Sequence, residues 1–244
     1  MQPSASHTLS GDDRADLAEQ ELQAFSYIVS HDLSASFRHV AEFSRLLLGE
    51  LGDGLTGRQQ GHARQILTAT GQCQQMMDQL LAFSRVQQRT LEKARHDATQ
   101  NLRIVQLQLA AEIGDAEAEV SIGVLGEAYA DPELLATAFR HLLVNAIKFR
   151  RPGVPPLIVV RSVQDETFWR LRIADNGVGV EPAYREKAFR MFHRLNGEGA
   201  YPGVGAGLTI ARRIARRHGG EVAFVDCDEG ACIELSLPRG EAIH

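Results

Sequence analysis

Apolar side chains recur mostly at steps of three and four residues along residues 13–50, which is the spacing of one face of an α-helix. The pattern predicts one long helix across this range, preceded by a polar, disordered segment at 1–13. The stretch GELGDGLTG at 49–57 contains four glycines and is predicted to be a turn. The apolar positions of the helix are Leu17, Leu22, Phe25, Val29, Leu33, Phe37, Val40 and Leu47.

A second helix is predicted over residues 56–88. Its apolar positions alternate in steps of three and four residues, which is the spacing of a coiled-coil a/d seam. Two long helices joined by a tight turn form an antiparallel hairpin, which alone has too few faces to enclose a core. We therefore expect two copies to pair into a four-helix bundle. The alternative is a hairpin that packs on its own C-terminal domain. The seam consists of Ile66, Ala69, Cys73, Met76, Leu80 and Phe83.

Helical and strand patterns alternate irregularly from about residue 95 onward. The strands come in hairpin-like pairs, which favours an α+β sandwich with helices on one face of a mixed sheet. Trp169 is expected to pack within a strand, and the glycine-rich segment 176–206 is expected to be a functional loop. Helices are predicted at 98–111, 132–149 and 207–218, and strands at 119–125, 157–164, 168–175, 221–226 and 231–237.

Composition is that of an ordinary globular protein of 244 residues, with 44% hydrophobic and 23% charged residues. A net charge of −5 gives no electrostatic reason to expect nucleic acid or an anionic membrane as a partner. No apolar run is long enough to span a bilayer and no signal peptide is recognisable, so a cytoplasmic protein without membrane insertion is expected. Cys73, Cys227 and Cys232 are predicted to be reduced core thiols, and no structural metal is expected.

His31 and Asp32 are the first candidates for chemistry. His31 lies two residues from both Val29 and Leu33, about 200° around the helix from these apolar positions, so its ring is expected to face solvent. A neighbouring carboxylate can fix the tautomer of an imidazole, raise its basicity and take its proton when the ring acts as a nucleophile. The alternative is a solvated surface pair.

Three polar residues share one face of the helix predicted at 132–149. His141, Asn145 and Lys148 fall at positions i, i+4 and i+7. An Asn oxygen is a suitable neutral ligand for Mg²⁺, and a Lys can meet phosphate oxygens as a point charge. The alternative is an ordinary polar helix face.

Two glycine-rich motifs follow. Asp175 ends a predicted strand, where its carboxylate can accept a hydrogen bond from an exocyclic amine such as that of adenine, while Gly177 and Gly179 let the backbone approach a flat ring. The motif GVGAGL at 203–208 opens a helix, and backbone N–H groups at such a start bind phosphate oxygens. It matches neither a Walker loop nor a Rossmann fingerprint.

Residues 20–240 resemble the catalytic core of a bacterial sensor histidine kinase, and are most similar to the variety attached to phytochrome-type sensors. FSYIVSHDL resembles the phosphoacceptor box, LLVNAIKFR the N box, DNGVGV the first glycine box, FRMFHRL the F box and YPGVGAGLTIARRIARRHGG the second glycine box. The resemblance implies a phosphotransfer and dimerisation domain at 14–92. It also implies a catalytic ATP-binding domain of the Bergerat or GHKL type at 93–244.

The resemblance also implies roles for single residues. His31 would be phosphorylated with Asp32 as its acidic helper, Asn145 would hold Mg²⁺, and Asp175 would bind the adenine amine. Phe189 and Phe192 would anchor the lid. The other nucleotide-binding residues implied are His141, Lys148, Gly177, Gly179, Phe192, His193, Arg194, Gly203, Gly205, Gly207 and Leu208.

Three positions depart from the family pattern. Ser36 stands where the family usually has a helix-kinking proline. Ala35 replaces a Thr or Asn that positions water for phosphatase activity. His141 replaces the usual first Asn of the N box, and related ATPases have there a Glu that activates water, so simple ATP hydrolysis is disfavoured.

The resulting hypothesis is ATP-dependent autophosphorylation of His31 followed by transfer to an aspartate of a response-regulator receiver domain. The expected cofactors are ATP and Mg²⁺, and the expected partners are a second copy of the chain in a homodimer and an upstream sensor domain or sensor protein. One alternative is a degenerate kinase that serves as a nucleotide-binding dimeric scaffold. The departures from the family pattern at Ala35, Ser36 and His141 would agree with this alternative. Another is a serine kinase or ATPase of the same superfamily, for which the His31 hairpin would have no use.

Overall fold

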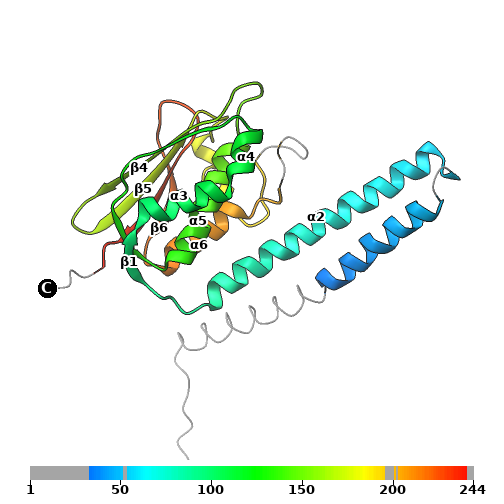
Figure 1. Ribbon diagram of the computed structural model, residues 1–244, viewed down its shortest axis with the longest axis horizontal. Coiled ribbons are helices and arrows are strands. Elements are labelled where there is room, and N and C mark those ends of the chain that lie inside the picture. The colour runs from blue at the N-terminus through cyan, green and yellow to red at the C-terminus, as the bar shows by residue number, and fades with distance from the viewer. Residues whose placement is uncertain (1–32, 52–53, 196–200, 202, 241–244) are drawn as a thin grey trace, which may run out of the picture. The chain divides into compact units, whose positions relative to one another are not determined.

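The computed structural model describes residues 33–51, 54–195, 201 and 203–240. The chain divides into two compact units, Met1–Ser84 and Arg85–His244 (Figure 1). The predicted disorder of residues 1–13 and the first half of the helix predicted at 13–50 lie outside the described residues. The boundary predicted between residues 92 and 93 stays a prediction.

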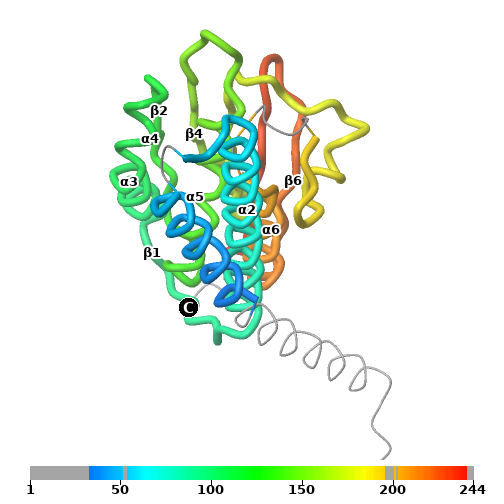
Figure 2. The backbone as a smooth tube through the Cα atoms, turned by 90° about the vertical axis from the view of Figure 1, so that its right-hand side faces the viewer, coloured from blue at the N-terminus to red at the C-terminus, as the bar shows by residue number. Residues whose placement is uncertain are grey.

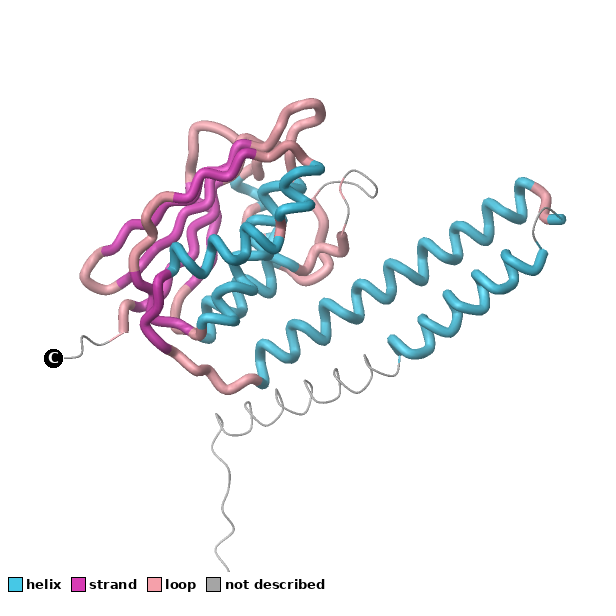
Figure 3. The backbone as a smooth tube through the Cα atoms, in the orientation of Figure 1, coloured by secondary structure: helices cyan, strands magenta, loops and turns pink. Residues whose placement is uncertain are grey.

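A helical hairpin makes up the described part of the first unit (Figure 3). Its first helix covers residues 33–51, and α2, Gly57–Gln88, runs back alongside it and continues into the second unit. The start of α2 is set by a capping box. The backbone N–H of Thr56 donates to Oε1 of Gln59 at 2.8 Å, and the backbone N–H of Gln59 donates to Oγ1 of Thr56 at 3.4 Å.

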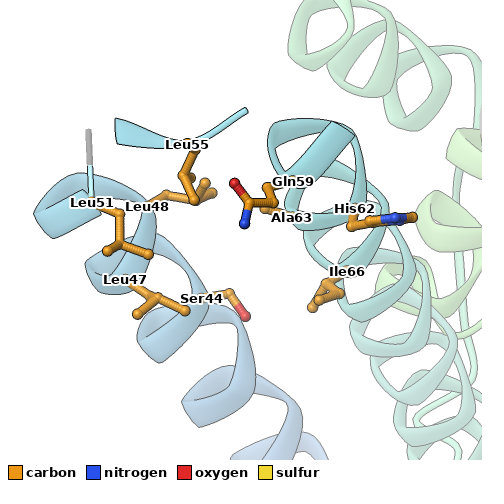
Figure 4. Close-up of a pocket in the computed structure, with 9 residues that line it drawn as sticks. All are labelled: Ser44, Leu47, Leu48, Leu51, Leu55, Gln59, His62, Ala63 and Ile66. Carbon is orange, nitrogen blue, oxygen red and sulfur yellow. The ribbon is translucent and has the colours of Figure 1, made fainter. Parts of the chain in front are cut away.

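Apolar side chains remain exposed on this hairpin in the single chain. Val40, Phe43 and Leu47 expose 46%, 68% and 57% of their surface. Figure 4 shows an apolar pocket near the turn, lined by Ser44, Leu47, Leu48, Leu51, Leu55, Gln59, His62, Ala63 and Ile66. Such apolar surface is what pairing into a four-helix bundle would cover, and this pairing stays a prediction.

The second unit is built on a five-stranded mixed sheet with the order β2-β4-β5-β7-β6, so β2 and β6 form its edges (Figure 2). β2 pairs with β4 in parallel, and the other pairs are antiparallel. A separate two-stranded sheet joins β1 to β3. The strands are β1 Ala94–Asp97, β2 Glu119–Ile122, β3 Glu127–Ala130, β4 Leu157–Gln164, β5 Phe168–Asp175, β6 Glu221–Val225 and β7 Cys232–Pro238.

Helices cover one face of this sheet (Figure 1). α5 contributes Phe139, Leu142 and Leu143 to the core, and the sheet contributes Trp169 and Leu171, all of them buried. Trp169 packs within its strand as predicted, and its Nε1 donates to the carbonyl of Leu125 at 2.8 Å. The helices are α3 Ala98–Gln108, α4 Ala110–Asp115, α5 Pro132–Lys148 and α6 Gly207–Arg217, with short 3-10 turns at Pro182–Tyr184 and Lys187–Phe189. The α+β sandwich predicted from the sequence is therefore confirmed.

Several details differ from the sequence predictions. The helix predicted at 98–111 breaks at Leu109, whose N–H bonds the carbonyls of both Val105 and Gln106, and α4 follows as a separate helix. The strands β1 and β3 were not predicted. Cys227 is exposed rather than in the core, because it lies in the turn between β6 and β7. In the part of the chain that the structure describes, no helix combines the length and apolar character needed to cross a bilayer.

The arginines of α6 form ion pairs and hydrogen bonds within the second unit. Arg212 pairs with Glu186 at 2.8 Å and with Glu221 at 2.7 Å. The guanidinium of Arg217 donates to the carbonyl of Val86, in the last turn of α2. Arg213 donates in turn to Oε1 of Gln87, and Arg216 also pairs with Glu221. The arginines of α6 therefore bind carboxylates, an amide oxygen and a backbone carbonyl of the same unit.

Candidate functional site

The polar face of α5 forms one wall of the candidate site. The helix begins at buried Asp131, whose carboxylate accepts the backbone N–H groups of Glu133 and Leu134 at 3.1 Å each. Residues 142, 143, 146 and 147 are buried in the core, so the helix is fixed in rotation about its axis. His141, Asn145 and Lys148 are half-buried on the remaining surface of the helix.

His141 lies against the start of α6. A Cβ atom added to Gly207 would be only 3.2 Å from Nδ1 of His141, so the glycine lets the ring approach the helix. Burial, and to a lesser degree the charge of Arg140, lowers the pKa of His141 to about 4. The imidazole is therefore neutral at pH 7.

Lys148 approaches the second glycine segment. A Cβ atom on Gly203 would lie 3.5 Å from its Nζ, and the ammonium stands 4.2 Å from the centre of the Phe149 ring. Burial lowers the pKa of Lys148, and the charge of Arg194 lowers it further. The side-chain amide of Asn145, one turn earlier, makes no hydrogen bond to any described residue.

Asp175 is held by the backbone at the end of β5. Its Oδ1 accepts the N–H of Gly177 at 2.9 Å and that of Ala231 at 3.1 Å, while its Oδ2 has no hydrogen-bond partner among the described residues. Burial raises the pKa of this carboxyl, although the two N–H groups act in the opposite direction. One oxygen is thus fixed by the fold, and the other can accept a hydrogen bond from a ligand.

The glycines after Asp175 are required by close backbone contacts. A Cβ atom on Gly177 would lie 2.4 Å from the carbonyl oxygen of Phe149, at the end of α5. Gly179 has a φ of +70°, and a Cβ there would lie 2.6 Å from the carbonyl oxygen of Gly230. Between these glycines, the N–H of Val178 donates to the Phe149 carbonyl at 3.0 Å. The first glycine motif is therefore packed against both α5 and the β6–β7 turn.

The segment 189–194 is fastened to α6. Phe189 is buried, and its carbonyl accepts the hydroxyl of Thr209 at 2.8 Å. Phe192 adopts a φ of +60°, and its N–H donates to the carbonyl of Gly205 at 3.0 Å. Arg194 donates to the carbonyl of Tyr201 at 2.6 Å, whereas the side chain of His193, expected near the nucleotide, is exposed.

The start of α6 presents backbone N–H groups without a side-chain cap. Ala206 occupies the N-cap position and Gly207 begins the helix, followed by half-buried Leu208. Gly203 and Gly205 precede it with φ values of +107° and +77°. The first N–H groups of a helix lack intrahelical acceptors and carry the positive end of the helix dipole, so this start can bind an anion.

The second unit thus contains all the predicted nucleotide-site residues, while His31 and Asp32 lie outside the described residues. Three residues that support the site were assigned no role in the sequence analysis. Gly230 and Ala231 support Asp175 from the β6–β7 turn, and Tyr201 contacts Phe149, Arg150 and Arg194. The glycine at 230 was a visible turn signal, but its contact with Asp175 arises only from the pairing of β5 with β7.

Comparison with known proteins agrees with this geometry. Residues 130–241 match the family of histidine kinase-, DNA gyrase B-, and HSP90-like ATPases. Cyanobacterial phytochrome A from Nostoc sp. is 31% identical over 230 residues, which are 90% of this chain and 29% of that protein. The structure of the mycobacterial sensor histidine kinase MprB is 28% identical with a TM-score of 0.51, covering 60% of this chain and 97% of that one.

A further solved structure, full-length ShkA in complex with AMPPNP, has a similar fold with a TM-score of 0.61 at 22% identity, covering 88% of this chain and 44% of that one. Residues 130–241 therefore form an ATPase domain of the histidine kinase type. Over most of its length the chain is similar to the catalytic core of sensor histidine kinases. It spans about 29% of the length of the cyanobacterial phytochrome that it matches.

Proposed function

We propose that this chain catalyses ATP-dependent autophosphorylation of His31 and passes the phosphoryl group to an aspartate of a response regulator. The observation that carries the proposal is the convergence of α5 with two glycine segments. His141 meets Gly207, Lys148 meets Gly203, and Phe149 meets Gly177. A histidine kinase needs such a site to hold a nucleotide by its base and by its phosphates.

Each group of residues has a distinct part in nucleotide binding. The free oxygen of Asp175 accepts the exocyclic amine of adenine, and the absence of side chains at Gly177 and Gly179 leaves the backbone open to the ring. Lys148, Arg194 and the N–H groups at the start of α6 bind the phosphates. Gly203, Gly205 and Leu208 shape this phosphate side, and Phe192 positions the segment between the two glycine motifs.

Magnesium fits the donor set of this site. Asn145 offers one neutral oxygen, which suits an ion that retains water and is held mainly by phosphate oxygens. Among the described residues no cluster of His, Cys, Asp and Glu side chains could cage a metal ion. A site with one Asn oxygen suits an ion whose other ligands are phosphate oxygens and water. When bound, Mg²⁺ neutralises charge on the β- and γ-phosphates.

In the transfer step a ring nitrogen of His31 attacks the γ-phosphorus while the bond to the β–γ bridging oxygen breaks. ADP leaves with the electron pair, and Asp32 takes the proton of the imidazole. The protein contributes mainly positioning and charge neutralisation. His141 does not compete by activating water, because an imidazole whose pKa is about 4 is a weak base.

The proposed partners follow from the hairpin and from the relatives. The exposed apolar side chains of the hairpin support a homodimer, in which two hairpins form a four-helix bundle. The solved complex of histidine kinase ThkA with the response regulator TrrA has a similar fold, with a TM-score of 0.62 at 17% identity. A receiver domain as phosphoryl acceptor and an upstream sensor domain or sensor protein complete the proposal.

Incubation with γ-labelled ATP tests the activity directly. Wild type should acquire label that is labile in acid and stable in alkali, as expected of phosphohistidine. His31→Gln should abolish the label while retaining ATP binding, and Asn145→Ala should reduce both the label and its dependence on Mg²⁺. Nucleotide binding without any label in wild type would instead indicate a dimeric nucleotide-binding scaffold. The mass in solution would show whether the chain dimerises.

A further inference from the structure

Tyr201 joins two segments that the proposed nucleotide site brings together. Its ring packs against that of Phe149, with centroids 5.0 Å apart and planes tilted by 57°. Its hydroxyl donates to the carbonyl of Arg150 at 3.0 Å, and its own carbonyl accepts a guanidinium N–H of Arg194 at 2.6 Å. One residue therefore ties the end of α5 to the segment that carries Arg194.

The two side chains next to these contacts are both cationic. Lys148 lies over the other partner of the aromatic pair, with its ammonium 4.2 Å from the centre of the Phe149 ring. Burial lowers the pKa of Lys148, and the charge of Arg194 lowers it further, so the two cations repel each other. Contacts that keep them close therefore work against this repulsion until an anion binds.

We propose that Tyr201 is a positioning residue that holds Lys148 and Arg194 together for the phosphates of the nucleotide. The ring of Tyr201 fixes Phe149 beneath the ammonium of Lys148, and the backbone carbonyl of Tyr201 orients the guanidinium of Arg194. Tyr201 itself contacts neither the base nor the reacting atoms. The inference rests on the proposed function, and it identifies the phosphate groups as the part of the ligand on which Tyr201 acts.

The test compares ADP with adenosine, which lacks phosphates. Affinities are measured on the full chain by displacement of a trinitrophenyl derivative of ATP. Removing an aromatic contact and a hydrogen bond should weaken ADP binding in Tyr201→Ala by about tenfold, while adenosine binding changes by less than about twofold. Tyr201→Phe keeps the ring and should lose only about threefold for ADP.

Tyr184→Ala is the matched control, because Tyr184 is exposed and contacts none of these residues. A second readout is the pH profile of ADP affinity above pH 8. Tyr201→Ala keeps the carbonyl that binds Arg194 but removes the ring and the hydroxyl that tie residue 201 to Phe149 and Arg150. Arg194 is then held less firmly beside Lys148 and the pKa of Lys148 rises toward its ordinary value, so ADP affinity should persist to higher pH than in wild type.

Three results would overturn the inference: ADP affinity unchanged in Tyr201→Ala, an equal loss for ADP and adenosine, or an unaltered pH profile. Failure of wild type to bind the ATP derivative, ADP or adenosine would instead overturn the proposed function. The two failures are therefore distinguishable. Circular dichroism of each variant establishes that the fold is retained.

Discussion

Replacement of His141 by Gln should remove much of the acid sensitivity of the second unit. In the folded protein, burial holds the pKa of His141 at about 4, against an ordinary value of 6.5. The unfolded chain therefore binds a proton more readily than the folded chain between these pH values. The stabilisation due to the neutral ring is fully present above pH 6.5 and is lost as the pH falls toward 4.

The expected size follows from the two pKa values. Each pKa unit corresponds to about 1.4 kcal/mol, so the free energy of unfolding should fall by up to about 3 kcal/mol over this window through His141 alone. Buried His218, whose pKa is also lowered by burial, adds to the acid sensitivity of both wild type and variant. The difference between their pH profiles consequently isolates His141.

Urea unfolding at several pH values between 7.5 and 4.5 measures this difference. Trp169, the single tryptophan of the chain, is buried in β5, so its fluorescence reports the unfolding of the second unit. His193→Gln serves as control, because His193 is exposed in the same unit. Parallel profiles for wild type and His141→Gln would refute the assignment of a neutral, buried imidazole.

Three further predictions concern other contacts of the site. Gly230→Ala should weaken ATP binding by more than about tenfold in an ATP titration, because the new Cβ would lie 1.9 Å from the carbonyl oxygen of Asp175 and the backbone φ is +64°. Gly114→Ala is the control and should leave the affinity unchanged, because its Cβ would meet no atom within 4 Å. Asp175→Asn should lower affinity for ATP far more than for inorganic triphosphate, since the base loses its acceptor; equal losses would contradict this role. Asp131→Ala should lower the free energy of unfolding by about 2–4 kcal/mol in urea, because a helix cap and a buried acceptor are lost together; a change below about 0.5 kcal/mol would contradict the role of this cap.

The strands with the clearest alternation were predicted from the sequence at their observed bounds. LIVVRSVQ and FWRLRIAD became β4 and β5, because buried and exposed positions alternate along most of each. β1 and β3 have only four residues each, and two helices and a strand lie between them in the sequence, so the pair Ala94–Ala130 joins distant segments. Pairing of such short segments depends on the packing of the whole domain, which local pattern does not reveal.

The candidate site was predictable wherever a residue type is dictated by the local backbone. Gly203, Gly205 and Gly179 have positive φ values that favour glycine, so their motif was visible in the sequence. The residues that hold the site residues in place through their backbone groups were not predictable in this way. Ala231 supplies only a backbone N–H to Asp175, and an alanine carries no sign of that role.

The carboxylate of Asp131 links the chain after α2 to both helices of the site. Its Oδ2 accepts the N–H of Glu92 at 3.2 Å and pairs with Arg89 at 3.4 Å, while its Oδ1 caps α5. Its own backbone N–H donates to Nε2 of His218, immediately after α6, at 3.0 Å, and Nδ1 of that ring lies 2.8 Å from the carbonyl of Ile214. For both bonds to form, His218 must be neutral with its proton on Nδ1, which agrees with its lowered pKa. Because all these groups are arranged around one buried carboxylate, residues 89–92 cannot shift without breaking contacts at the start of the helix that carries His141, Asn145 and Lys148.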